Sequence, residues 1–175
     1  MRYRSLLLVL VIIGATSAPV LAQESGDVVG RPELSLTVSD NHFTPGQQAA
    51  MNVTISNDGL LIRGGPVKYE ERVTTARDVE LEVQSSELRD RYGGAITVKS
   101  GPVAAGNVPT GAVGPFSFVL EVNESIEPGT YEIPVRLSYQ YTSFIEYSST
   151  QATEYRDVNR RVTEEVEIVV EDRPR

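Results

Sequence analysis

Apolar residues recur at every second position along several short segments of this chain. Polar or charged residues fill the positions between them, which is the pattern of a strand with one buried and one exposed face. Gly, Pro and Asn residues separate the segments and indicate turns. The predicted strands cover residues 33–38, 51–55, 79–83, 96–98, 116–122, 131–141 and 166–170. Short strands separated by turns predict an all-β fold, an immunoglobulin-like antiparallel β-sandwich, with a closed barrel as the alternative.

The C-terminal part of the chain departs from this even spacing. Residues 138–170 have β character on both sides of the polar segment SSTQAT, so they predict a long β-ribbon that protrudes from the sandwich. Aromatic residues are enriched at protein interfaces, which makes the tyrosines of this ribbon a candidate contact surface. These are Tyr139, Tyr141, Tyr147 and Tyr155. The alternative, which we favour, is cross-strand pairing that only stiffens the ribbon.

Two other segments interrupt the strand pattern. Residues 59–77 are rich in Gly and charged residues, and we expect a protruding hairpin or loop there. Residues 85–94, SSELRDRYGG, are the only helical candidate and are long enough for a turn or two.

The N-terminus has the pattern of a secretory signal peptide. Arg2 and Arg4 precede an apolar run, and small residues lead up to Ala22, so residues 1–22 are the predicted signal with cleavage after Ala22. An uncleaved membrane anchor is the alternative, but Gly14 and Pro19 weaken a spanning helix. No later apolar segment is long enough to span, so we expect no stable membrane span after cleavage and a secreted or cell-surface location.

The remaining chain is predicted to form one domain. Residues 23–32 are polar and contain Gly, which indicates a flexible leader, and the immunoglobulin-like domain is predicted over residues 33–171. The chain has no Cys, so thiolate metal sites and cysteine nucleophiles are excluded, and the fold must depend on its core alone.

Charge narrows the range of partners. The chain carries 24 acidic and 16 basic residues; without Arg2 and Arg4 the balance is 14 to 24, a net charge of −10. Lys68 and Lys99 are the only lysines. An acidic, lysine-poor surface is typical of a halophilic source, and we expect a fold that needs salt, although an ordinary acidic extracellular protein is the alternative. No basic stripe is present to neutralise phosphates, so nucleic acid is not an expected partner.

Catalytic patterns are not found. His42 is the only histidine; it lies beside a turn, no nucleophile-elbow motif accompanies it, and we expect an exposed loop residue. Adjacent acids such as Glu164 and Glu165 point to opposite faces of a strand and do not form a catalytic pair. We therefore predict no enzyme activity, no catalytic residues and no cofactor.

Oxygen ligands suggest one weak metal hypothesis. A loop calcium site could combine the carboxylate and amide oxygens of Asp40, Asn41, Asn57 and Asp58, but their spacing matches no known calcium loop. We therefore predict no metal site.

Two glycosylation sequons are present. They begin at Asn52 and Asn123. Both residues alternate with core-facing positions and should point outward, where a glycan can be attached. Their occupancy depends on the host and is left open.

Two segments resemble a known family. They are FTPGQQAAMNVTISNDG at 43–59 and SIEPGTYEIPVRLSYQY at 125–141. Together they are similar to the S-layer-related domains of secreted haloarchaeal proteins, which are akin to the NEW3 and CARDB immunoglobulin-like modules. The match rests on Pro45, Gly46, Asn57, Gly59, Pro128, Gly129 and Tyr131. The family's usual Pro-Gly-Glu element is replaced here by PTGAVGPF at 109–116.

The resemblance implies a function class. Such domains are non-catalytic, secreted or cell-surface modules of the archaeal envelope, which contribute to surface structure or protein–protein contacts; some stand beside membrane exporters. The implied partners are envelope or surface proteins. An envelope glycan-binding module is the main alternative, although Trp, the best sugar platform, is absent.

Overall fold

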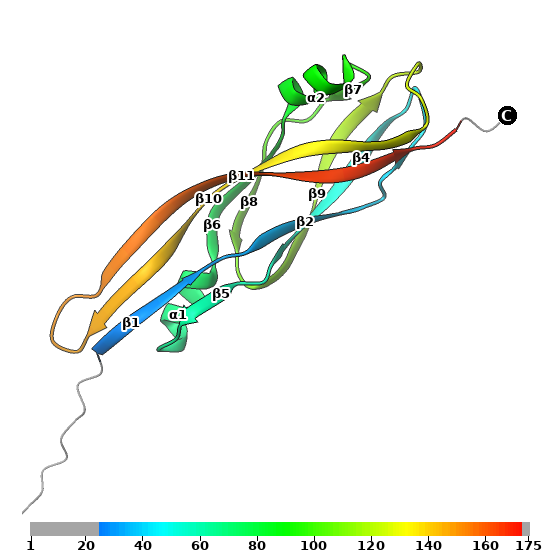
Figure 1. The fold of residues 1–175 in the computed structure, drawn as a ribbon. Helices are drawn as coiled ribbons and strands as arrows, with labels where there is room; N and C mark the ends of the chain where they lie inside the picture. The colour runs from blue at the N-terminus through cyan, green and yellow to red at the C-terminus, as the bar shows by residue number, and fades with distance from the viewer. Residues whose placement is uncertain (1–24, 173–175) are drawn as a thin grey trace, which may run out of the picture.

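The protein is an elongated, two-layered β structure (Figure 1). The computed structural model describes residues 25–172. The strands are β1 (Ser25–Arg31), β2 (Leu34–Ser39), β3 (His42–Phe43), β4 (Gln48–Asn57), β5 (Leu60–Arg63), β6 (Ala76–Val83), β7 (Ile96–Val98), β8 (Val103–Val108), β9 (Gly111–Val122), β10 (Gly129–Ser148) and β11 (Glu154–Val170). The helices are α1 (Val67–Thr74) and α2 (Ser85–Tyr92). The predicted all-β, immunoglobulin-like sandwich is confirmed.

Strand β10 organises the larger sheet. It pairs with β11 over Gly129–Glu146, with β6 over Val135–Gln140 and with β1 over Phe144–Ser148. The larger sheet has seven strands in the order β3-β11-β10-β1-β5, with β6 joined to β10 and β8 joined to β6. The smaller sheet has the order β2-β4-β9-β7. At roughly 3.3 Å per residue, the twenty residues of β10 extend over about 66 Å.

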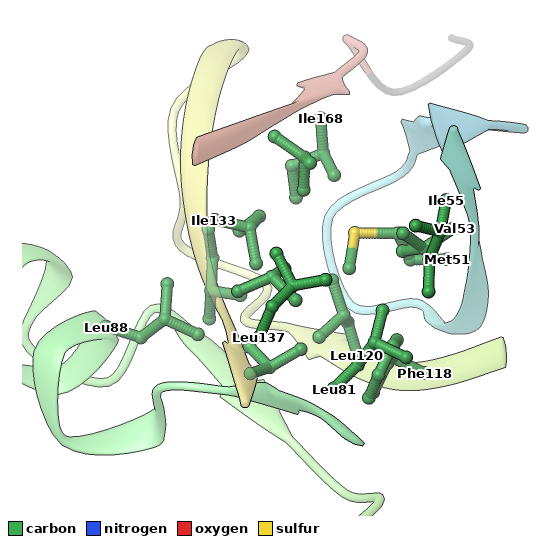
Figure 2. Close-up of a cluster of buried hydrophobic side chains, with 14 of the residues drawn as sticks. Met51, Val53, Ile55, Leu81, Leu88, Phe118, Leu120, Ile133, Leu137 and Ile168 are labelled. Carbon is green, nitrogen blue, oxygen red and sulfur yellow. The ribbon is translucent and has the colours of Figure 1, made fainter. Parts of the chain in front are cut away.

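The main hydrophobic core lies between the two sheets. Alternate residues of β4, of the C-terminal half of β9 and of β10 as far as Tyr141 point into it, as the alternating pattern predicts. Figure 2 shows Met51 and Val53 of β4 opposite Leu137 of β10, with Phe118 and Leu120 of β9 completing the layer. All five side chains are fully buried. Burial of this two-sided apolar layer is the main stabilising contribution to the sandwich.

One turn of the sandwich carries a feature common in immunoglobulin-like folds. The phenol of Tyr131, just after the Pro128–Gly129 turn, donates a 2.7 Å hydrogen bond to the carbonyl of Glu127. A tyrosine that bonds to backbone a few residues upstream fixes the corner where a strand begins. Tyr92 packs edge-on against the same ring, with centroids 5.3 Å apart.

The ribbon beyond the sandwich has a small core of its own. A β-bulge in β10 between Thr142 and Phe144 shifts the alternation by one position. As a result Ile145 does not continue the sandwich core but packs with Val28 of β1 and Val73 of α1. All three are fully buried. The predicted C-terminal ribbon is therefore present, and β1, β5 and α1 support it along part of its length (Figure 1).

The prediction of a flexible leader over residues 23–32 is wrong for the residues that the structure describes. Ser25–Arg31 form strand β1, which is paired with β10 on one side and with β5 on the other. Val28 contributes to the small core, and Gly30 lies so close to α1 that a Cβ there would be 2.7 Å from Val73 Cγ2. The glycines that suggested flexibility are thus needed for close packing. The predicted signal, residues 1–22, lies outside the described residues.

Residues 59–77 do not form a loop but contain strand β5 and helix α1. The sequence does not reveal α1 because Val73 is its only buried residue, so no apolar stripe marks its inner face. The predicted helix at 85–94 is confirmed as α2, which ends at Gly93 in the left-handed conformation. Across residues 25–172, neither helix has the length and apolar character that a membrane span requires.

Candidate functional site

The four tyrosines of the predicted contact surface do not lie on one surface. Tyr139 and Tyr141 are each 8 % exposed and belong to the sandwich core. Tyr147 packs against Tyr69 of α1, with ring centroids 5.2 Å apart. Tyr155 alone is well exposed, at 47 %, and the Arg72 guanidinium lies 4.4 Å from its ring centroid. Most of this aromatic set therefore stabilises the fold, but through core burial and packing on α1 rather than through the cross-strand pairing that the favoured alternative predicted.

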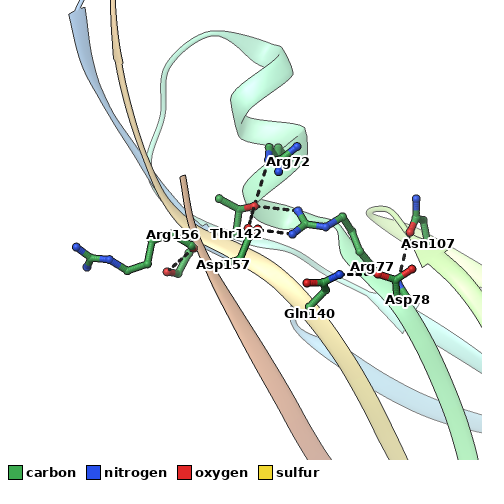
Figure 3. A network of polar contacts seen from close by, with 9 residues as sticks. Arg72, Arg77, Asp78, Asn107, Gln140, Thr142, Arg156 and Asp157 are labelled. Carbon is green, nitrogen blue, oxygen red and sulfur yellow. Dashed lines mark hydrogen bonds and ion pairs between the residues drawn. The ribbon is translucent and has the colours of Figure 1, made fainter. Parts of the chain in front are cut away.

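A polar cluster occupies the β10 bulge, where the sandwich meets the ribbon. We call Arg72, Arg77, Thr142 and Asp157 the Thr142 cluster (Figure 3). The Thr142 hydroxyl is fully buried; it accepts hydrogen bonds from Arg72 Nε at 3.2 Å and Arg77 Nη1 at 2.8 Å, and donates to Asp157 Oδ1 at 2.6 Å. Arg77 Nη2 also donates to Asp157 at 2.9 Å. One buried hydroxyl thus connects α1, β6, β10 and β11.

The bonding pattern lowers the pKa of Asp157. The Thr142 hydroxyl donates to the carboxylate and is the main cause, and the Arg77 guanidinium adds to it. Both interactions favour the charged form. Because the pKa is lowered in the folded state, the stabilisation is present at neutral pH and is lost as the pH falls through the folded pKa.

We expect Thr142→Val to lower the free energy of unfolding by about 1–3 kcal/mol, since the substitution leaves guanidinium donors and a carboxylate without their buried partner. Thr142→Ser keeps the hydroxyl and is the matched control, with a smaller loss. Urea unfolding followed by circular dichroism measures both. Equal stability of Thr142→Val and Thr142→Ser would contradict the role of the Thr142 hydroxyl.

Asp157→Asn should destabilise the protein at pH 7. The difference in free energy of unfolding between this variant and the unsubstituted protein should shrink below pH ~4, where carboxylates protonate.

A shallow polar hollow of about 480 Å³ lies beside the cluster on the face formed by β6, β10 and β11. Its lining residues are Asp78, Glu80, Ser138, Tyr139, Gln140, Asn159, Arg160 and Arg161. Asp78 has a positive φ of 52°, and its Oδ2 accepts a 2.6 Å hydrogen bond from Gln140 Nε2. Two acids face two arginines here, so the hollow is suited to polar contacts with a partner rather than to a charged small molecule.

A second hollow, of about 290 Å³, lies where Arg31 and Leu34 approach β10 and β11. Tyr139 and Tyr141 line it, but their rings are too buried to present a face to a sugar. Burial raises the pKa of the Tyr139 phenol above its ordinary value. This geometry does not favour the glycan-binding alternative, which needs an open aromatic ring.

His42 is exposed, as predicted, although it lies in the short strand β3 rather than in a loop. Its Nδ1 is 2.7 Å from Glu171 Oε1, and both side chains are more than half exposed. Such an exposed pair contributes little to stability. It contacts no serine in the hydrogen bonds of the described chain and does not resemble a catalytic triad.

The calcium hypothesis is wrong. Strands β2 and β4 are antiparallel, which puts Asp40 and Asn41 at one end of the pair and Asn57 and Asp58 at the other. The six residues of β2 separate the two groups by roughly 20 Å. Between residues 25 and 172 no cluster of three His, Cys, Asp or Glu residues is arranged to hold a metal ion.

Asn57, one of those proposed ligands, has a structural role that the sequence does not reveal. It is 1 % exposed. Its Oδ1 accepts from the backbone N–H groups of Glu33 at 3.1 Å and Gly59 at 3.0 Å. Its Nδ2 donates to the carbonyls of Thr74 at 2.8 Å and Val108 at 3.0 Å. One side chain thus joins the start of β2, the β4–β5 turn, the end of α1 and the end of β8.

Both sequon asparagines lie on the outside, as their spacing predicts. Asn52 alternates with buried residues of β4, is half-buried itself and accepts a 2.6 Å hydrogen bond from Ser117 Oγ. Asn123 is exposed after β9, and its Oδ1 accepts from both the N–H and the hydroxyl of Ser125. Attachment of a glycan at either position remains a prediction.

One surface feature was not predicted from the sequence. Five large hydrophobic residues are exposed in the described chain, and four of them lie within the eight residues 60–67. These are Leu60, Leu61, Ile62 and Val67, of β5 and the start of α1. The unbroken Leu-Leu-Ile run in a Gly-rich segment was the available signal.

Fold and sites together define a class: an all-β, two-sheet sandwich extended by a supported β-ribbon. No known family matches the chain, and no curated protein matches it either.

Proposed function

We propose that the protein is a non-catalytic, secreted or cell-surface β-sandwich module of an archaeal envelope, S-layer-like, that contributes to surface structure or protein–protein contacts. The observation that carries this proposal is the extended architecture itself. The long β10–β11 hairpin continues beyond the sandwich and has its own small core of Val28, Val73 and Ile145. An elongated scaffold of this kind exposes much surface to neighbours, and it follows a predicted secretory signal.

The chemistry of the described surface supports contact rather than catalysis. Several surface charges are paired with one another, as Lys99 is with Glu121 and Arg31 with Glu33. The polar hollow beside the Thr142 cluster is open and balanced in charge. Surfaces with both signs of charge interspersed give specificity to protein contacts.

Localisation and cross-linking in a haloarchaeal host test the proposal. A C-terminally tagged full-length chain should be recovered from the medium or the envelope, and a variant that lacks residues 2–22 should stay in the cytoplasm. Cross-linking of intact cells before purification should capture envelope proteins with the exported chain only. Cytoplasmic recovery of the full-length chain, or export without any cross-linked envelope protein, would contradict the proposed role. A glycan array tests the alternative, for which we expect no binding.

A further inference from the structure

The exposed hydrophobic residues of residues 60–67 form one continuous stretch of chain, which we call the β5 patch. Leu60 is 36 % exposed, Leu61 39 %, Ile62 64 % and Val67 66 %. Single exposed apolar residues are common on protein surfaces, but four in eight consecutive positions are not. Such a concentration indicates a surface that is covered by a partner.

Strand β5 also has a free edge. It pairs with β1 on one side and ends the larger sheet on the other. An edge strand offers unpaired N–H and C=O groups to another strand, and proteins usually protect it with charges, proline or a cover. Within Leu60–Ile62 the edge carries neither a charged residue nor proline; Arg63 is the one charged residue of the four-residue strand, and the register with β1 shifts at Ile62. A second strand could therefore add to the sheet here.

The distribution of charge along the chain indicates which strand pairs with β5. From residue 23 on the chain has a net charge of −10, with 14 basic and 24 acidic residues, so two copies repel each other over most of their surfaces. Residues 60–67 contain a single charged side chain, Arg63, and it is neutralised by Asp27 at 2.9 Å. The segment thus brings no carboxylate of its own to a second copy, and the neighbouring carboxylates of Asp27 and Glu70 are bound to Arg63 and to the backbone N–H of Gly65.

We propose that β5 pairs antiparallel with β5 of a second copy and joins two larger sheets into one. A two-fold axis at the position of Ile62, perpendicular to the sheet, places Ile62 of one copy directly opposite Ile62 of the other, with Leu61 opposite Arg63. This run of apolar residues is complementary to itself, so the same segment of a second copy can supply the pairing strand. This inference goes beyond the proposed function, since it names a partner and holds wherever the protein is located.

Four residues a side make a small interface, so the association is weak and depends on salt. Salt screens the repulsion between the two acidic chains and leaves the apolar contact intact. We therefore expect the dissociation constant to fall as NaCl is raised from about 0.1 M to about 2 M.

Sedimentation velocity of the exported protein, from about 1 μM to about 1 mM, tests the pairing. We expect a reversible monomer–dimer equilibrium and a dissociation constant that rises about tenfold or more in Ile62→Lys, which places like charges opposite each other across the axis. Ile62 is exposed, so the substitution should not disturb folding. Thr97→Lys is the matched control, because Thr97 is an exposed residue of β7, the edge strand of the smaller sheet. It should leave the equilibrium unchanged.

Cysteine cross-linking gives a second readout, because the chain has no Cys. A short bis-maleimide should link Ile62→Cys into dimers and should not link Thr97→Cys. A monomer at every concentration and salt would overturn the proposal, as would a dimer that Ile62→Lys leaves intact. Binding of the monomer to phospholipid vesicles that Ile62→Lys abolishes, without dimers, would assign the patch to a lipid surface and also overturn it. None of these results depends on the proposed envelope role, which the localisation experiment tests separately.

Discussion

Asn57→Ala should lower the free energy of unfolding by roughly 3–4 kcal/mol, because two N–H groups and two carbonyls lose their partner at a site that is 1 % exposed. The affected groups belong to Glu33, Gly59, Thr74 and Val108. The loss should extend beyond one turn, since this side chain joins the sandwich to the elements that support the ribbon. Guanidinium unfolding, with the slope checked for two-state behaviour, measures it.

Asn57→Asp separates the roles of the two ends of the side chain. A carboxylate can still accept from the two N–H groups, but it faces the carbonyls of Thr74 and Val108 and cannot donate to them. Burial should raise the pKa of the new carboxyl in the folded state, so part of the lost stability should return as the pH is lowered through that pKa. Asn52→Asp, on the outer face of the same strand, is the control and should show little change. Equal losses at the two positions would contradict the role of Asn57 in joining these elements.

Phe118→Ala is the second large effect, with an expected loss of about 3–5 kcal/mol. Phe118 is fully buried between the sheets, opposite Met51 on the neighbouring strand β4, and its removal leaves a cavity that two paired sheets cannot close. Thermal and denaturant unfolding should both show the loss.

The control has the same chemistry in a different setting. Phe144 is half-buried beyond the bulge, and the Arg156 guanidinium lies 5.3 Å from its ring centroid. Phe144→Ala should therefore cost less than half as much as Phe118→Ala. Comparable losses would mean that the ribbon and the sandwich depend equally on their aromatic packing, contrary to the burial of the two rings.

The strands that could be predicted are those with one buried face. Met51, Val53 and Ile55 alternate with polar residues, and period two alone places them in the core. Strand β1 lacks this signal, since Val28 and two glycines give no clear alternation in seven residues. Helix α1 was missed for a related reason, as it buries only Val73. Short elements that contact the fold through one side chain leave too weak a pattern to detect.

The predictions of functional residues were wrong for a different reason. Asn57 was considered as a ligand for its amide oxygen, but three of its four partners are backbone groups 17 to 51 residues away in the chain, which no local pattern reports. The bulge after Thr142 changes which residues of β10 face the sandwich core, so alternation alone does not reveal that Tyr147 packs against Tyr69 of α1. At Asn57 and at the bulge, the sequence gives the residue type but not the residues that surround it in the fold.

The pairing of β10 also decides how the molecule would respond to being pulled. Strand β1 begins at Ser25, opposite Ser148 of β10, and strand β11 ends at Val170, opposite Gly129 of β10. The start of β1 and the end of β11 therefore lie at opposite ends of β10. A force applied between these two points acts along β1 and β11, parallel to their axes. It therefore acts on many interstrand hydrogen bonds in shear at once, rather than opening them one by one. A module attached at one end and loaded at the other would resist extension through this geometry.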